Sequence, residues 1–210
     1  MALLKLDISR EERQFIYAWF NAMLARELSD EQLNALQAGE FDDFFAYLSE
    51  LGFAEQVAKF QAELTACNRL EFPRLELAAD FAQLFLLEGN LSAIPYASAY
   101  LNGEVLEKNL AEMDRLLGEF GLQVNRESKE PSDHLCVYLT LFDRLLAEKP
   151  LEEQQQFLQN QLMSWLPAWF AKAKTVKTNT GVYPALLELF EEVLLAEQQQ
   201  PLYLRMICIE

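Results

Sequence analysis

The stretch SDHLCVYLTLFDRLL, residues 132–146, indicates the fold class of the chain. Its apolar side chains recur every three or four residues and share one helical face: Leu135, Tyr138, Leu139, Phe142, Leu145 and Leu146. Ser132 can cap this helix and Asp133 suits its first turn, because both side chains accept hydrogen bonds from unpaired backbone N–H groups. Pro150 ends the pattern. We therefore expect an amphipathic helix that begins near Ser132 and ends before Pro150.

The same periodicity runs along most of the chain. Further helical patterns occupy residues 9–24, 29–39, 41–51, 53–64, 75–85, 105–120, 151–174 and 184–194. Pro167 is expected to kink or split the pattern over 151–174. The 39 leucines outnumber the 12 valines and isoleucines, which favours helices, because β-branched side chains suit strands. The sequence predicts an all-α protein, a helical bundle of about nine to ten helices.

Residues 121–132, GLQVNRESKEPS, interrupt this pattern with a polar segment that lacks periodicity. We predict an N-terminal helical subdomain over 1–120, a hinge or linker over 121–132, and a C-terminal helical subdomain over 133–210. A hinge of this length could let two chains exchange halves, which would give a domain-swapped dimer.

The charge of the chain limits its partners. The chain contains 17 Lys and Arg against 33 Asp and Glu, a net charge of −16. This acidity argues against nucleic acid and against an anionic membrane surface, because both are bound through clustered basic side chains. The first residues lack a secretory signal, and no apolar run approaches the roughly 18 residues of a membrane span. We expect a cytoplasmic protein.

Motifs that would indicate catalysis or metal binding are absent from the sequence. One histidine and three scattered cysteines, Cys67, Cys136 and Cys208, give no metal-ligand spacing. The chain also lacks the glycine-rich phosphate loops and the G-x-S-x-G nucleophile elbow. We therefore expect no metal site, no catalytic residue and no enzymatic activity.

The single histidine lies in Glu130-Pro131-Ser132-Asp133-His134. Two neighbouring carboxylates would favour its charged form. Three interpretations follow: a helix N-terminus with an incidental histidine, a polar recognition site, or a hydrolase-like enzyme with Asp133 and His134 as an acid–base pair. The residues alone leave these open, although no nucleophile or cofactor motif accompanies the pair.

A second segment, GNLSAIPYASAYLNG over residues 89–103, carries no charge and contains Pro95, Tyr96 and Tyr100. A long uncharged loop is unusual on so acidic a chain. It either packs on the core or lines a recognition surface, and loops often carry function.

Both segments resemble motifs of a known family. The run EPSDH, residues 130–134, followed by LCVYLTLFDRL resembles a signature of the TorD/DmsD family of redox-enzyme maturation chaperones. RLELAADF (74–81), LFL (84–86) and PYASAY (95–100) resemble its second signature, in wording similar to the TorD branch. Trp165-Leu166-Pro167 resembles a third, looser element. Gln161 stands near the position where relatives often have a histidine.

The resemblance implies a cytoplasmic chaperone that binds the twin-arginine signal peptide and the apo form of a molybdoenzyme. For the TorD branch this client is trimethylamine N-oxide reductase. The chaperone would assist insertion of the molybdenum cofactor and prevent premature export. Some relatives bind guanine nucleotide, but this chain has no phosphate loop, so we expect no cofactor of its own.

A twin-arginine peptide is basic at one end and apolar in the middle, which suits an acidic surface with aromatic contacts. Asp133 and Glu130 would supply charge, and the aromatic residues apolar contact. Plain core packing is at least as well supported for Phe81 and Phe85, which lie at helical spacing. We predict a signal-peptide- and client-binding surface that comprises Asp80, Phe81, Phe85, Pro95, Tyr96, Ser98, Tyr100, Glu130, Pro131, Asp133 and His134.

Overall fold

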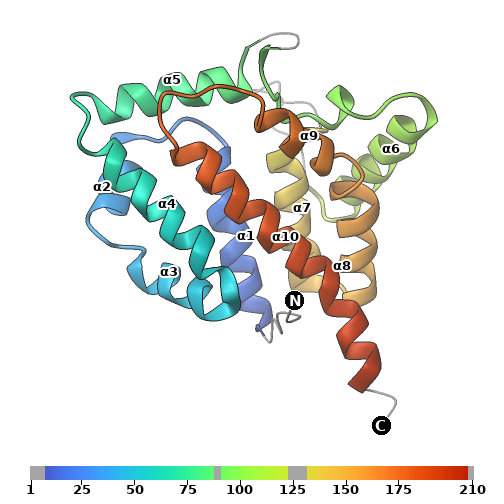
Figure 1. Ribbon diagram of the computed structural model, residues 1–210. Helices are drawn as coiled ribbons and strands as arrows, with labels where there is room; N and C mark the ends of the chain where they lie inside the picture. Colours follow the sequence, from blue (N-terminus) through green and yellow to red (C-terminus); the bar gives the residue numbers. More distant parts are fainter. Residues whose placement is uncertain (1–7, 88–90, 123–131, 208–210) are drawn as a thin grey trace. The chain divides into compact units, whose positions relative to one another are not determined.

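The computed structural model describes residues 8–87, 91–122 and 132–207, with side chains up to residue 199 (Figure 1). Regular structure in these ranges is helical and includes no strand, which confirms the predicted all-α fold. None of these helices is long and apolar enough to cross a membrane. The α-helices are α1 (Arg10–Leu24), α2 (Asp30–Gln37), α3 (Asp42–Leu48), α4 (Ala54–Cys67), α5 (Pro73–Phe85), α6 (Gly103–Glu119), α7 (Leu135–Glu148), α8 (Leu151–Phe157), α9 (Leu166–Ala173) and α10 (Val182–Ile207).

Contacts group the described residues into two compact units. Unit 1 is formed by Arg26–Ala93 and the segment that begins at Lys172, and unit 2 by Ile8–Ala25 with Ile94–Ala171. These boundaries differ from the predicted subdomains 1–120 and 133–210. The helices on either side of the predicted hinge, α6 and α7, both belong to unit 2. The units depend on which apolar faces pack together, and order along the sequence does not reveal that.

The predicted hinge itself falls largely on residues 123–131, which lie outside the described residues. Exchange of halves between two chains around this segment stays a prediction.

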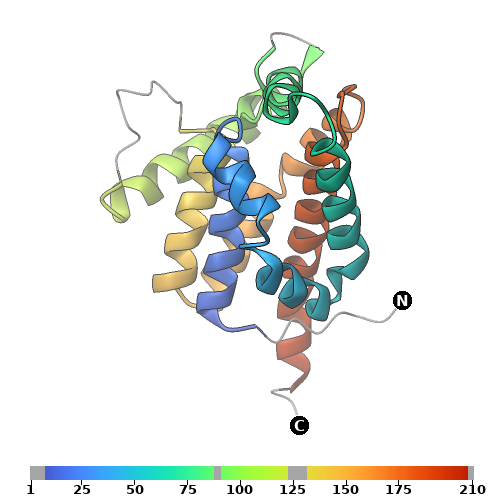
Figure 2. The same cartoon turned by 90° about the vertical axis from the view of Figure 1, so that its left-hand side faces the viewer.

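Unit 2 is built around the pairing of α1 with α7, which lie side by side (Figure 2). The rings of Tyr17 and Phe142 meet edge to face with centroids 4.8 Å apart. Arg13 donates from Nη1 to Oε1 of Gln154 at 2.9 Å, which attaches α1 to α8 through a buried hydrogen bond. A capping box begins α1, in which the side chain of Ser9, the N-cap, accepts a hydrogen bond from the N–H of Glu12 and the Glu12 side chain accepts one from the N–H of Ser9.

The predicted helix over 151–174 is split, as Pro167 suggested. It consists of α8, a π-helical turn η4 (Leu158–Leu162) and α9, in whose first turn Pro167 lies. Proline is tolerated there because the N–H it lacks would have no partner within the helix.

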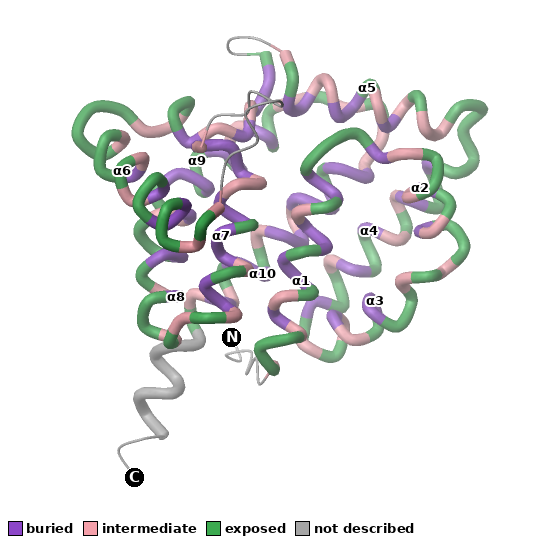
Figure 3. The backbone as a smooth tube through the Cα atoms, turned by 180° about the vertical axis from the view of Figure 1, so that it is seen from behind, coloured by how far each residue is buried: buried purple, intermediate pink, exposed green. Residues whose placement is uncertain are grey.

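Unit 1 pairs α4 with α10. Lys59 of α4 binds Glu188 of α10, and the rings of Phe45 and Phe60 lie 5.7 Å apart. Figure 3 shows buried positions recurring along the helices, as the apolar stripes of the sequence predict.

Gly52 joins α3 to α4 with a positive φ of 102°, a conformation that side chains with a Cβ disfavour. We expect Gly52→Ala to lower the free energy of unfolding by about 1–2 kcal/mol. Gly118→Ala in α6 is the control, because its φ is not positive and a Cβ there meets nothing within 4 Å. The control should stabilise by up to about 1 kcal/mol. Urea unfolding of both variants tests this, and equal losses would contradict it.

Candidate functional site

The uncharged loop and the histidine turn predicted from the sequence lie against each other in unit 2. The backbone N–H of Ala97 donates to the carbonyl oxygen of Asp133 at 3.0 Å. The N–H of Leu135 donates to the carbonyl oxygen of Pro95 at 2.8 Å. These bonds hold two segments together that are more than thirty residues apart along the chain. We refer to residues 95–100 with Asp133 and His134 as the loop–turn site.

Asp133 stabilises the loop rather than the start of α7. Its carboxylate accepts a hydrogen bond from the backbone N–H of Ser98 at 3.0 Å, and only 5% of the residue is exposed. The prediction that Asp133 lies in the first helical turn is wrong, because α7 begins at Leu135. The carboxylate is therefore used inside the site to fix the loop, whereas the sequence suggested a charge on the surface.

His134 is the N-cap of α7, the position predicted for Ser132. Its Nδ1 accepts a hydrogen bond from the N–H of Cys136 at 3.2 Å, which satisfies one of the free N–H groups at the helix start.

His134 also contacts the loop. It forms an isolated antiparallel bridge with Tyr96, and the two rings meet edge to face with centroids 4.9 Å apart. Only 8% of His134 is exposed. Both side chains of the predicted acid–base pair thus bind backbone N–H groups and position the loop.

Tyr100 closes the other end of the loop. Its hydroxyl donates to the carbonyl oxygen of Ile94 at 3.1 Å, and its ring stacks on Trp165 at 5.9 Å. Burial raises the pKa of Tyr100 to about 12. Pro95 is buried, Tyr96 and Tyr100 are half-buried, and Ser98 is exposed. The outward surface of the site is therefore small, uncharged and edged with aromatic side chains.

The predicted residues of α5 belong to unit 1 and form part of its interior. Asp80 is 1% exposed, and its carboxylate accepts hydrogen bonds from the backbone N–H groups of Asn179 (2.6 Å) and Thr180 (2.8 Å) and from the Thr180 hydroxyl (2.7 Å). It fixes the loop that leads into α10.

Phe81 and Phe85 are core residues, as their helical spacing allowed. They pack edge to face on each other at 5.0 Å, and both contact the ring of Tyr183. Their burial leaves little surface for direct contact with a partner. Glu130 and Pro131 lie outside the described residues.

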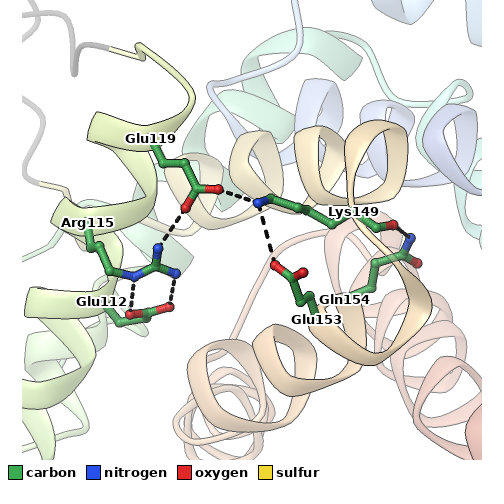
Figure 4. A network of polar contacts seen from close by, with 6 residues as sticks. All are labelled: Glu112, Arg115, Glu119, Lys149, Glu153 and Gln154. Carbon is green, nitrogen blue, oxygen red and sulfur yellow. Dashed lines mark hydrogen bonds and ion pairs between the residues drawn. The ribbon is translucent and has the colours of Figure 1, made fainter.

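A polar network in unit 2 was not singled out from the sequence (Figure 4). Arg115 donates to both carboxylate oxygens of Glu112, at 2.7 and 2.8 Å, and to Glu119 at 2.6 Å. Lys149 binds Glu119 and lies 3.6 Å from Glu153. Hydrogen bonds from Lys149 and Arg115 lower the pKa of Glu119. The sequence signal for this network was the spacing of Glu112 and Glu119, three residues before and four residues after Arg115. Such pairs are common on exposed helices, so the spacing does not single out a site.

The described residues contain no group of three His, Cys, Asp or Glu side chains that could hold a metal ion. An all-helical fold whose candidate site is a fixed, uncharged loop suits a protein that binds other proteins.

Comparison with known proteins agrees with this class. A family model described as "Nitrate reductase delta subunit" matches residues 49–171. A protein named "Chaperone protein TorD" from Actinobacillus pleuropneumoniae serotype 3 is 52% identical over 87% of this chain and 92% of its own length. Proteins of the same name from Actinobacillus succinogenes (50% identity, 90% and 98% coverage) and Pasteurella multocida (45%, 92% and 99%) also match. The chain belongs to the TorD family of chaperones, which confirms the resemblance, and this is not a family of enzymes.

Asp80→Asn should destabilise the fold, because an amide NH2 group would replace a carboxylate oxygen that accepts hydrogen bonds. We expect the free energy of unfolding to fall by about 2–4 kcal/mol. Asp43→Asn, at an exposed position of α3, is the matched control and should change it by less than about 0.5 kcal/mol. Chemical unfolding measures both, and similar values for the two variants would refute the structural role.

Tyr100 should make stability depend on pH in the alkaline range. Its pKa is about 12 in the fold and about 10 in the unfolded chain. The native state therefore favours the neutral phenol, so its contribution is complete below pH 10 and is lost between about pH 10 and 12. Burial also raises the pKa of Tyr138 and Tyr183, so Tyr100→Phe should reduce this loss without abolishing it. Urea unfolding across this range tests it, and identical pH profiles would argue against it.

Proposed function

We propose that this chaperone assists maturation of a molybdoenzyme, trimethylamine N-oxide reductase, in the cytoplasm. It would bind the apo-enzyme and its twin-arginine signal peptide, assist insertion of the molybdenum cofactor, and prevent premature export. Membership of the TorD family supports the class of function. The proposal requires no cofactor bound to the chaperone itself.

The observation that carries the proposal is the contact between the two motifs of the sequence. The bond from Ser98 to Asp133 spans 35 residues of chain and turns two separate motifs into one surface. That surface includes the exposed Ser98 and Ala99 and the half-buried Tyr96 and Tyr100. A loop fixed in this way loses little conformational entropy when a partner binds, so more of the contact energy contributes to affinity.

The chemistry of this surface suits the apolar middle of a signal peptide. Aromatic rings give a large contact area with few rotatable bonds. The arginines of such a peptide would be attracted by the net charge of −16. Asp133 and His134 would act as positioning residues for the loop.

Titration of a labelled twin-arginine leader peptide tests the proposal. Affinity should fall as salt rises, because the attraction is screened over a Debye length of about 10 Å at 0.1 M. Asp133→Ala should weaken binding about tenfold or more through release of the loop. Asp114→Ala removes an equal charge at an exposed position of α6 and is the matched control.

Amide hydrogen exchange in the free proteins separates positioning from direct contact. The N–H groups of Ala97 and Ser98 should exchange faster in Asp133→Ala than in wild type or in Asp114→Ala. Equal affinities of the two variants would sink the site assignment. The proposed function would be refuted if the apo-enzyme failed to co-purify with the chaperone both when the enzyme carries its leader peptide and when it lacks it.

A further inference from the structure

A pocket of about 250 Å³ opens on unit 2, away from the loop–turn residues in sequence. Its floor is apolar and consists of Leu116 of α6, Leu145 of α7 and Phe157 of α8, each at most 4% exposed. Its rim is polar and includes Glu112, Glu153, Gln156, Asn160 and Gln161. This volume is below the range of about 300–1,000 Å³ typical of small-molecule sites, so it suits a single side chain.

The π-helical turn η4 supplies two groups of the rim, Asn160 and Gln161. Such turns are rare and recur at functional sites. The backbone of this turn is fixed, because the carbonyl oxygen of Gln161 accepts hydrogen bonds from Asn109 Nδ2 (3.3 Å) and Ser164 Oγ (3.0 Å). Asn109 is itself buried and accepts a hydrogen bond from the hydroxyl of Tyr138. The backbone at Gln161 is therefore held in place before any ligand arrives.

The side chain of Gln161 is incompletely satisfied. Its Oε1 is buried and has no hydrogen-bond partner among the residues that the structure describes. A buried acceptor without a donor costs free energy, which a ligand that brings an N–H group could recover after a small side-chain rotation. The pocket thus favours a hydrogen-bond donor.

The charges at the pocket favour a cation. The pocket is lined by two carboxylates, Glu112 and Glu153, and by one cation, Arg115. The guanidinium of Arg115 is already bound by Glu112 and Glu119 (Figure 4). Glu153 has only the longer contact of 3.6 Å to Lys149, and its side chain is 46% exposed. Glu153 is therefore the carboxylate best placed to bind a further positive group.

We propose that this pocket binds the side chain of an arginine from a partner peptide. The apolar floor would contact its alkyl stem, while Glu153 and the amide oxygens of the rim would accept hydrogen bonds from its guanidinium. Several separate acceptors suit a planar group with five donors better than a compact ammonium. As to which protein supplies the arginine, the inference rests on the proposed function, because a twin-arginine signal peptide offers such side chains.

Binding of N-acetyl-arginine amide to the full chain, followed by NMR, tests the pocket directly. We expect the largest shifts at the amides of 153–161, and affinity about tenfold lower for Glu153→Gln and for Gln161→Leu. Glu148→Gln, in α7 and outside the pocket lining, is the matched control and should bind like wild type. N-acetyl-lysine amide should bind at least about fivefold more weakly than N-acetyl-arginine amide.

The outcomes separate the pocket from the proposed function. Shifts spread over the whole acidic surface, or equal affinities of Glu153→Gln and Glu148→Gln, would overturn the pocket. Equal binding of the lysine derivative would overturn the preference for guanidinium. A leader peptide that binds with unchanged affinity to Glu153→Gln, while the arginine derivative does not bind wild type, would overturn the pocket and leave the proposed function standing. Binding of the arginine derivative without binding of the leader would do the reverse.

Discussion

Two loops of this protein depend on buried carboxylates that accept hydrogen bonds from backbone N–H groups. A loop packed against a core loses water as a partner for its N–H groups, so each needs an acceptor within the protein. Asp80 meets this requirement for the loop before α10, and Asp133 meets it for the loop of residues 95–100. Because the carboxylate is charged, these bonds are stronger than those between neutral groups. Each loop is thereby held in one conformation although neither belongs to an α-helix, and the loop of residues 95–100 contains only the short 3-10 turn Ala97–Ala99.

This use of Asp133 changes how the motif of the sequence is understood. An acidic residue beside a histidine suggests acid–base chemistry or a charge offered to a basic partner. In the structure both side chains face inward and bind backbone groups, and the surface they create belongs to the loop. The side chains that this surface exposes in whole or in part are therefore Tyr96, Ser98 and Tyr100 of the loop, while Asp133 and His134 hold the loop in place.

The sequence predicted what depends on local pattern and not what depends on tertiary packing. Helical periodicity identified the all-α class, and Pro167 indicated the split of the 151–174 pattern, because both signals are encoded within a few neighbouring residues. Helical spacing also allowed Phe81 and Phe85 to be core residues, and the structure places both in the core. The cap of α7 was assigned to Ser132 instead of His134, since several residues near a helix start can accept the same bond. The compact units could not be predicted, because nothing local shows that α1 pairs with α7.

Helix α7 connects the loop–turn site with the pocket proposed to bind arginine. Its first residues meet the loop, and the buried ring of His134 packs against Tyr96 of the uncharged loop at its N-terminal end. One turn further on, Tyr138 binds Asn109, which holds the backbone of Gln161 at the polar pocket. An apolar segment and a basic side chain of one peptide need such different environments, because charge is solvated poorly where apolar groups bind well. A single rigid helix that fixes both environments keeps the distance between them constant, so one peptide of suitable length could gain from both contacts without a further entropic cost for ordering the protein.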